Sequence, residues 1–381
     1  MKSSRFSSMY VSGALVLLNT LVIFLVLNAA AYLVLSLYEY LSESDPVSEK
    51  YGEERLKTVY PHLNGDEIRE LLQETWSRSY VYEPFTQFRE RAYQGEYVNV
   101  DINGYRISKN QAVWPPPAGE FNIFLFGGST TFGYGVEDSQ TIASHLQDSM
   151  RSSLGGKVNV YNFGRGFYYS TQERILFEVL LSSGYVPDIA VFIDGLNDFY
   201  HYDGNPLYTE RLGRYVSGEI RRITFFSKLP ITRLFVALLG DNDEEGGTAS
   251  GQSGNVRYDD PSVLGGVITR YFENKKIIEA VAAAYDVKPV FVWQPVPTFN
   301  YDTSHHLFAG SDFARHTYSR YGYALMKTYT KEHAQGADFL WAADLQQDIK
   351  RPLYVDQVHY TGEFSSQLAD FISQHLAKNY F

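Results

Sequence analysis

The sequence predicts an α/β protein in which a three-layer, flavodoxin-like parallel sheet follows one transmembrane helix. Two observations carry this prediction. From about residue 121 onward, short apolar runs alternate with helical patterns, as is typical of a parallel sheet covered by helices on both faces. Near the N-terminus, residues 6–38 contain no charged side chain. The 381 residues, of which 44% are hydrophobic and 20% charged, are enough to bury a substantial core.

The charge-free stretch is predicted to be a membrane anchor over residues 10–38. Its apolar centre, Val11–Leu37, exceeds the roughly 20 residues that span a bilayer, whereas a secretory signal has an apolar region of roughly 7–15. A cleaved signal is the alternative. Basic residues precede the stretch and acidic residues follow it, and positive charge stays on the cytoplasmic side. We therefore expect a single-pass membrane protein with residues 1–9 in the cytoplasm and residues 40–381 outside it.

A stalk and an aromatic-rich segment, residues 39–120, follow the anchor. Residues 39–56 are acidic and polar, and we expect them to form a juxtamembrane stalk. Apolar side chains at helical spacing predict a helix over 65–78, and a short strand is expected over Tyr97–Ile102. The aromatic side chains of this segment either pack against the next domain or line a cleft that binds a sugar or an acyl group.

The domain over residues 121–381 is expected to contain the sheet, because strands buried on both faces have continuous apolar sequences. Five such runs occur, at Phe121–Phe126, Val158–Phe163, Ile189–Ile193, Val287–Trp293 and, more weakly, Phe339–Ala342. Helices are expected around 142–150, 172–181, 277–282, 323–332 and 362–376. A ligand site in such a sheet lies at the carboxyl ends of the strands.

An insertion at about residues 200–262 separates the third and fourth predicted strands. Its middle, Gly240–Asn255, is rich in glycine, serine and aspartate, and we expect it to be mobile. The flank Ile223–Leu239 has apolar and basic residues and predicts a packed helix. An amphipathic lid, or a helix lying on the membrane, is the alternative.

The composition argues against several classes of function. The net charge of −11 is unlike that of a general nucleic-acid binder, which needs a basic surface. The chain has no cysteine, which excludes disulfides, cysteine-ligated zinc, iron–sulfur clusters and a thiol nucleophile. His305 and His306 beside Asp302 suggest a metal, but neighbouring residues of an extended chain point to opposite sides. We expect no metal and no cofactor.

Three short segments at the ends of predicted strands have the residue types of an acyl-transfer site. Gly127-Gly128-Ser129 would expose a hydroxyl at a helix start, where backbone N–H groups can receive an oxyanion. An ordinary helix N-cap is the alternative role for Ser129. The glycines of residues 162–167 allow a backbone N–H to approach a ligand. Asn197 could place an amide N–H beside a developing negative oxygen.

A fourth segment, Asp356-Gln357-Val358-His359, precedes the last predicted helix. A spacing of three residues is about one helical turn, so both side chains can face one way. A carboxylate beside an imidazole fixes its tautomer and stabilises the imidazolium. A purely structural bond between Asp356 and His359 is the alternative, and Asp194 at the end of the third strand is a rival acid.

Together these segments resemble the SGNH (GDSL-like) hydrolases over about Phe121–Leu376. The matching motifs are Gly127-Gly128-Ser129, Gly195-Leu196-Asn197-Asp198, Asp356-Gln357-Val358-His359 and Val292-Trp293-Gln294-Pro295. The resemblance implies that Ser129 is the nucleophile, His359 its general base and Asp356 the orienting acid. It also implies an oxyanion hole and a substrate-lining set. The oxyanion donors would be Ser129, Gly166 and Asn197, and the lining residues Phe167, Trp293 and Gln294.

Two positions depart from the family pattern. Gly128 occupies the middle position of the family's Gly-Asp-Ser, which is compatible with activity because that Asp is not the nucleophile. The family's oxyanion glycine aligns either with Gly166 or, in a direct register, with Phe167. A backbone N–H is present in both alignments, but the pocket beside Phe167 would be narrower.

The resemblance implies a membrane-anchored serine esterase that removes acyl groups, acetyl above all, from an envelope glycan or lipid. An O-acyltransferase with the same triad, working with envelope polysaccharide machinery, shares the first half-reaction and is the first alternative. An inactive glycan-binding or scaffold subunit is the second, and the intact set of Ser129, Asn197, Asp356 and His359 argues against it.

Overall fold

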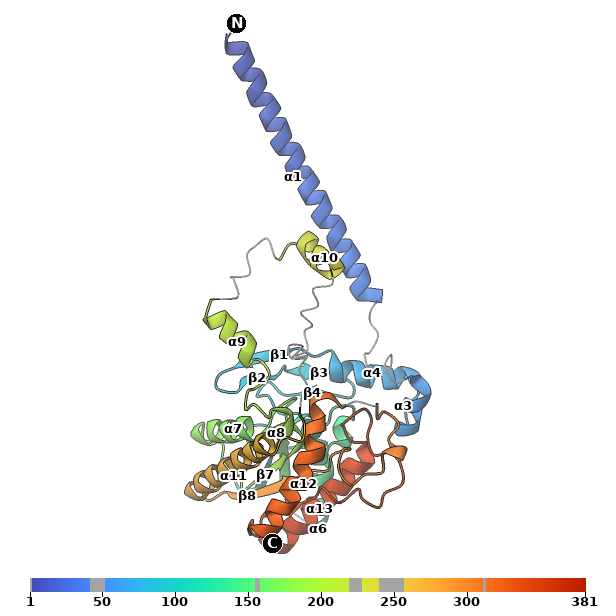
Figure 1. The fold of residues 1–381 in the computed structure, drawn as a ribbon, viewed down its shortest axis with the longest axis vertical. Coiled ribbons are helices and arrows are strands. Elements are labelled where there is room, and N and C mark those ends of the chain that lie inside the picture. Colours follow the sequence, from blue (N-terminus) through green and yellow to red (C-terminus); the bar gives the residue numbers. More distant parts are fainter. Residues whose placement is uncertain (1, 42–51, 155–157, 219–227, 240–256, 311–312) are drawn as a thin grey trace. The chain divides into compact units, whose positions relative to one another are not determined.

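The computed structural model describes residues 2–41, 52–154, 158–218, 228–239, 257–310 and 313–381 (Figure 1). The chain forms two compact units, one of residues 1–44 with 208–251 and the other of residues 45–207 with 252–381. Two predicted features lie outside the described residues: positions 42–51 of the stalk, and the glycine-rich middle of the insertion, Gly240–Asn255.

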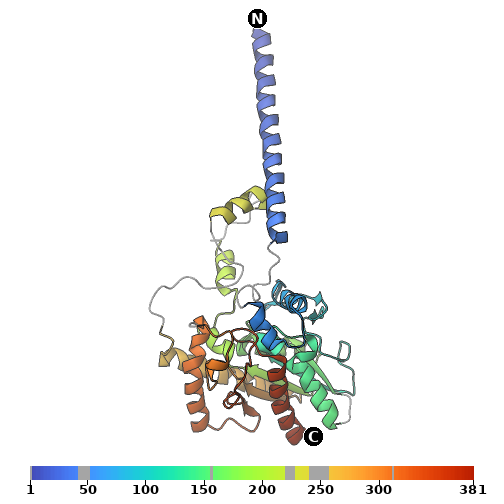
Figure 2. The same ribbon diagram turned by 90° about the vertical axis from the view of Figure 1, so that its right-hand side faces the viewer.

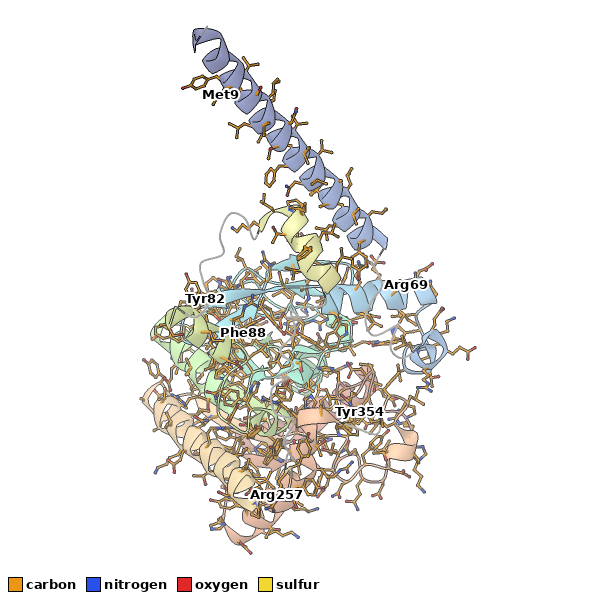
Figure 3. The ribbon with its side chains drawn as sticks, turned by 45° about the horizontal axis from the view of Figure 1, so that its top comes forward. Met9, Arg69, Tyr82, Phe88, Arg257 and Tyr354 are labelled. Carbon is orange, nitrogen blue, oxygen red and sulfur yellow. The ribbon has the colours of Figure 1, made fainter. Side chains whose placement is uncertain are left out.

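The first unit contains the predicted anchor. Helix α1 covers Lys2–Leu41, and its stretch Met9–Tyr38 is the one helix among the described residues that is long and apolar enough to cross a membrane. Figure 3 shows its side chains, from Met9 onward, standing out from the helix. A membrane span and a signal sequence share this character. The same unit holds α9 (Thr209–Val216) and α10 (Pro230–Leu239) of the insertion.

The second unit is built on a five-stranded parallel sheet with the order β6-β5-β7-β8-β9. Numbered along the sheet, this is the order 2-1-3-4-5 of flavodoxin-like proteins, so the predicted fold class is confirmed. All five predicted runs form strands, at β5 (Phe121–Gly127), β6 (Val158–Asn162), β7 (Ile189–Asp194), β8 (Lys288–Trp293) and β9 (Phe339–Trp341).

Helices cover both faces of this sheet (Figures 1 and 2). On one face, side chains of α6 (Ile142–Leu154) and α13 (Gly362–Tyr380) join the apolar core of the strands. The other face is covered by three longer helices and one short one. They are α7 (Ser170–Ser182), α11 (Pro261–Ala284), α12 (Thr317–Glu332) and the short α8 (Leu196–Tyr200). The continuous apolar strand sequences follow from this double cover.

The segment before the sheet is more ordered than its sequence predicts. It forms the elements α3 (Glu53–Val59), α4 (Gly65–Trp76), β1 (Tyr80–Glu83), β2 (Gln87–Glu90), β3 (Tyr93–Gln94) and β4 (Asn99–Val100). The end of the predicted stalk is therefore helical, with Leu56 fully buried. A capping box between Asn64 and Glu67 starts α4, and the predicted strand over Tyr97–Ile102 is only two residues long.

This segment packs on the loops that carry the predicted site. Its core includes Leu72 and Val98 together with Tyr134, five residues after Ser129, and Val355, next to Asp356. The buried guanidinium of Arg106 donates to the carbonyl oxygens of Phe132 and Val136, at 3.1 and 2.6 Å. The segment and the sheet, which the sequence separates at residue 120, thus belong to one unit.

Candidate active site

Ser129 is the first residue of the short helix α5 (Ser129–Phe132), directly after β5. The N-cap position is taken by Gly128, so Ser129 does not have the N-cap role that was the alternative. The absence of a side chain at Gly128 is required by close packing. A Cβ atom there would lie 2.3 Å from Nδ2 of Asn197 and 3.1 Å from the carbonyl oxygen of Tyr168. The hydroxyl of Ser129 is thereby placed at the carboxyl edge of the sheet.

The three residues predicted as a triad form one chain of hydrogen bonds. Oγ of Ser129 lies 2.8 Å from Nε2 of His359, and Nδ1 of His359 lies 2.7 Å from Oδ2 of Asp356. His359 and Asp356 are buried, while Ser129 is partly exposed. With Nδ1 donating to the carboxylate, the unprotonated Nε2 can accept the proton of the serine hydroxyl. A serine hydroxyl, an imidazole and a carboxylate are thus in contact, which is the arrangement that a nucleophile, a base and an orienting acid require.

The side chains of Asp356 and His359 face each other, as their spacing allows, but the segment is not a helical turn. The segment is a tight loop closed by an antiparallel bridge between Tyr354 and Tyr360. Oδ1 of Asp356 accepts the backbone N–H groups of Val358 and His359, both at 2.9 Å. Such side-chain-to-backbone bonds are how aspartate stabilises a turn, and they leave Oδ2 free for the imidazole. The same facing of the two side chains is reached by a different backbone.

The carboxylate of Asp356 is held in its ionised form. Burial alone would raise the pKa of this carboxyl, but the charge of His359 and the hydrogen bonds from His359 and two backbone N–H groups lower the pKa below its usual value. The carboxyl of Asp356 therefore carries its negative charge at neutral pH. An ionised partner favours the imidazolium that forms when His359 accepts a proton.

Asn197 lies in α8 beside Gly128, and its Nδ2 donates to the carbonyl oxygen of Tyr168 at 2.7 Å. The amide has a second N–H that this bond does not use. The N–H of Ser129 belongs to the first turn of α5, where no helical carbonyl precedes it. Both groups therefore suit the oxyanion role that the sequence predicts for them.

Gly166 does not suit that role in this structure. Its N–H donates to Oε1 of the buried Glu90 at 3.1 Å. Among the N–H groups from Gly164 to Tyr168, only that of Phe167 makes no hydrogen bond within the described part of the chain. Phe167 also has a φ of 61°, in the left-handed region that glycine favours. The structure thus fits the direct register, with Phe167 at the glycine position of the family.

The three predicted substrate-lining residues have different surroundings. The side chain of Trp293 is fully buried and packs on Tyr271 and Tyr323, so its prediction as a lining residue is wrong. The reason is the alternation of side chains along β8, which turns Trp293 into the helical layer. Gln294 is also buried, and its Oε1 accepts the hydroxyl of Thr130 at 2.8 Å. Phe167 is half-buried.

A second imidazole stands near the site. The ring of Phe167 lies 5.9 Å from that of Tyr200, which in turn lies 4.9 Å from the ring of His316. Burial, followed by the charge of His359, lowers the pKa of His316 to about 4. His316 is therefore neutral at ordinary pH.

Two aromatic residues contact His359 that the sequence did not mark as part of the site: Trp76 of the N-terminal segment and Tyr134, which follows α5. The ring of Trp76 meets the imidazole edge-on at 5.4 Å, and the ring of Tyr134 stacks on it at 5.4 Å. Trp76 shares the helical spacing of Ile68 and Leu72, so the sequence predicts only that it belongs to their helix. No local signal distinguishes an aromatic residue that packs on a core from one that packs on a functional imidazole.

Glu90 connects the ring of Tyr134 to the loop that contains Gly166. Its Oε1 accepts the N–H of Gly166 at 3.1 Å and the hydroxyl of Tyr134 at 2.9 Å, while Oε2 accepts a bond from Arg78 at 3.3 Å. The side chains of Glu90 and Arg78 are almost completely buried. One carboxylate therefore holds both the ring that stacks on His359 and the loop that carries Phe167.

We expect Glu90→Gln to lower kcat at least tenfold with little change in KM. Gly166 and Tyr134 both donate to Oε1, and a neutral amide oxygen is a weaker acceptor than a carboxylate oxygen, so both bonds weaken. Displacing one oxyanion donor costs up to about 10²–10³ in rate. Steady-state kinetics on an aryl acetate measure this effect. Because Glu90→Gln leaves Arg78 without its partner, the double variant with Arg78→Met is the control. It should recover thermal stability but not kcat; recovery of both would mean that Glu90 acts on stability alone.

Three further carboxyl groups lie buried behind Asn197. Asp194, the rival acid, does not bond His359; it lies with Asp198 and Glu173 near Gly128 and Gln294. Burial, then the neighbouring carboxylates, raise the pKa of both Glu173 and Asp194 well above their usual values. Asp198 is anchored by the hydroxyl of Ser170 at 2.6 Å. The proximity of these acids means that they cannot all be ionised together.

Stability should therefore fall as pH rises, and Glu173→Gln should weaken that dependence. A carboxyl whose pKa is higher in the folded than in the unfolded chain binds a proton on folding. The stability that it contributes is fully present below the unfolded pKa and is lost as the pH rises through the folded pKa. The slope is at most about 1.4 kcal/mol per pH unit for one group. Thermal unfolding midpoints between pH 5 and pH 9 test this. Parallel curves for the two proteins would contradict the protonated state of Glu173.

No family model and no curated protein matches this chain. Solved structures do match. A lipase from a goat rumen metagenome is 10% identical with a TM-score of 0.40, over 67% of this chain and 97% of its own. A lipolytic G-D-S-L family protein from Veillonella parvula is 11% identical with a TM-score of 0.35, over 68% and 98%. A family two carbohydrate esterase from Clostridium thermocellum, solved with cellohexaose, is 13% identical with a TM-score of 0.36, over 70% and 66%. At such identities the likeness concerns the fold.

Proposed function

We propose that this chain is a serine esterase of the SGNH type, which removes acyl groups, acetyl above all, from an envelope glycan or lipid. The observation that carries the proposal is the unbroken series of contacts from Oγ of Ser129 to Nε2 of His359 at 2.8 Å, and from Nδ1 of His359 to Asp356 at 2.7 Å. A serine hydroxyl bonded to an imidazole that a buried carboxylate orients is the arrangement that activates serine for attack on an ester.

The first half-reaction forms an acyl-serine. Nε2 of His359 takes the proton of Ser129 as Oγ attacks the ester carbonyl carbon. The negative oxygen of the tetrahedral intermediate accepts hydrogen bonds from Asn197 and from the N–H groups of Ser129 and Phe167. The C–O bond to the leaving alcohol then breaks, and the imidazolium gives its proton to that alcohol.

The second half-reaction returns the free enzyme. A water molecule gives a proton to His359 and attacks the acyl carbon, and the same donors hold the second oxyanion. The bond to Oγ breaks, Ser129 regains its proton from the imidazolium, and a carboxylic acid leaves. Asp356 stays ionised throughout, as its lowered pKa supports. The apolar helix Met9–Tyr38, as a membrane anchor, would keep the enzyme at the envelope, where acylated glycans and lipids occur.

A serine-directed fluorophosphonate probe tests the proposal on the full chain in detergent. Ser129 should be the labelled residue, identified by mass spectrometry of the peptides, and prior incubation with an aryl acetate should slow labelling. Unlabelled Ser129 in a folded protein would overturn the esterase assignment. Adding sugar acceptors then separates the two enzymatic alternatives: free acetate as the main product supports the esterase, and acetylated sugar as the main product supports an acyltransferase.

A further inference from the structure

The helix α10 of the insertion packs on α1. Oδ1 of Asn28, within the apolar stretch Met9–Tyr38, accepts the N–H of Ile231 at 3.3 Å. Ala31, one turn further along α1, is only 3% exposed, although Ala30 beside it is exposed. Figures 1 and 2 show the two helices side by side. The insertion therefore packs against α1 near the C-terminal third of the apolar stretch Met9–Tyr38.

The depth of this contact follows from helix geometry. Asn28 lies ten residues before Tyr38, the end of the apolar stretch, and at 1.5 Å per residue this is about 15 Å along the axis. The hydrocarbon core of a bilayer is about 30 Å thick. If α1 spans the membrane up to Tyr38, a helix bonded to Asn28 lies in the same leaflet and not in water.

The start of α10 has the bonding that such a position demands, since an unpaired backbone N–H is costly in hydrocarbon. Pro230 has no N–H, and that of Ile231 is taken by Asn28. The N–H groups of Thr232 and Arg233 both donate to the carbonyl oxygen of Leu229, at 3.0 and 3.1 Å. All of the first-turn donors, which a helix normally leaves to water, have partners.

The outer surface of α10 is apolar and uncovered. Phe235, Val236 and Leu238 are 62%, 47% and 76% exposed. Arg233 is the only charged residue between Pro230 and Leu239, and its long side chain can extend toward lipid headgroups. A helix whose inner side contacts a membrane span, and whose outer side carries bare apolar side chains, matches the surroundings of acyl chains.

We propose that α10 is a second membrane element, which enters the bilayer beside α1 and presents Phe235, Val236 and Leu238 to the lipid acyl chains. This inference rests on the membrane span proposed for α1 and is independent of the esterase chemistry. The protein would then be attached to the membrane at two distant points of its sequence, the N-terminal helix and the insertion.

The absence of cysteine makes a direct test possible, because a single introduced thiol carries the only label. Phe235→Cys and Leu238→Cys are labelled with the environment-sensitive fluorophore NBD, and the full chain is reconstituted into phosphatidylcholine–phosphatidylglycerol vesicles. We expect bromine-labelled acyl chains to quench both positions by at least half. Leu18→Cys within α1 is the positive control, and Tyr285→Cys at the end of α11 is the surface control.

The outcomes separate the two claims. Quenching at Leu18 without quenching at Phe235 and Leu238 would overturn the membrane position of α10 while leaving the anchor intact. No quenching at Leu18 would overturn the anchor and this inference together. Aryl acetate hydrolysis in the same vesicles reports on the esterase separately, so its loss or retention does not bear on the position of α10.

A matched pair of variants tests the packing on α1. Ala31→Trp places a bulky ring where α10 contacts α1, whereas Ala30→Trp places it on an exposed side. The first should reduce the quenching of NBD at Leu238 by at least half, and the second should leave it unchanged. Equal quenching in both would mean that α10 does not depend on α1 for its position, and would overturn the docking.

Discussion

Ser129→Ala should abolish the acyl-enzyme and lower esterase turnover by roughly four or more orders of magnitude, as loss of a triad nucleophile does elsewhere. The reason is that the variant keeps the imidazole and the oxyanion donors but has no oxygen to bond to the acyl carbon. Rapid mixing with an aryl acetate should show no burst of released phenol, and intact-protein mass spectrometry should detect no added acyl group.

The control for this variant is the fold itself. Ser129 is partly exposed, and among the described residues its side chain bonds only His359, so alanine should leave the thermal unfolding midpoint within a few degrees of the native value. A folded Ser129→Ala protein with unchanged hydrolysis of the aryl acetate would exclude Ser129 as the nucleophile. Another side chain would then have to be the nucleophile.

Asn197→Ala should lower kcat by about 10²–10³ while leaving acyl-enzyme formation detectable, because one oxyanion donor of a set is removed and the nucleophile remains. KM should change less than kcat, since the amide acts on charge that develops after binding. The single-turnover rate of acylation is the most direct measurement. An effect confined to KM would assign Asn197 to substrate binding instead.

Gly128→Ala offers a matched test of the same donor. The added methyl would come 2.3 Å from Nδ2 of Asn197, so either the amide or the β5–α5 turn must shift. Gly128 has a φ of −83°, which alanine adopts readily, so backbone strain does not complicate the result. The rate loss should approach that of Asn197→Ala, and the double variant should lose little more than either single variant. Full additivity would show that Gly128 acts elsewhere.

The sequence was sufficient for the sheet because its strands are continuous apolar runs between helical patterns. The resemblance to SGNH hydrolases singled out Ser129, Asp356 and His359, and the structure brings these three side chains into contact. The sequence was insufficient where a role depends on a distant partner. Glu90 bonds Gly166, which is 76 positions later, and nothing in its own surroundings marks it as more than a charged residue of a short strand.

Other errors had local causes. Trp293 is part of the motif Val292-Trp293-Gln294-Pro295, which resembles SGNH hydrolases. Which way its side chain points, however, depends on the alternation of side chains along the strand and not on the motif. The spacing of Asp356 and His359 allowed their side chains to face one way but did not give the backbone, which is a loop held by two N–H groups bonded to Oδ1. The choice between Gly166 and Phe167 needed the carboxylate of Glu90, which the alignment of motifs does not contain.

The contacts of Trp76 and Tyr134 with His359, and of Glu90 with Gly166, determine where the chain can be shortened to obtain a soluble form. Shortening the chain to the part that resembles SGNH hydrolases, from residue 121, would remove the ring of Trp76 from His359 and the carboxylate of Glu90 from Gly166. The cut belongs between Leu41 and Glu53, where α1 has ended and α3 has not begun, and a soluble form would also require the removal of α10. Apart from α10, the chain from α3 onward would have to be expressed as one piece.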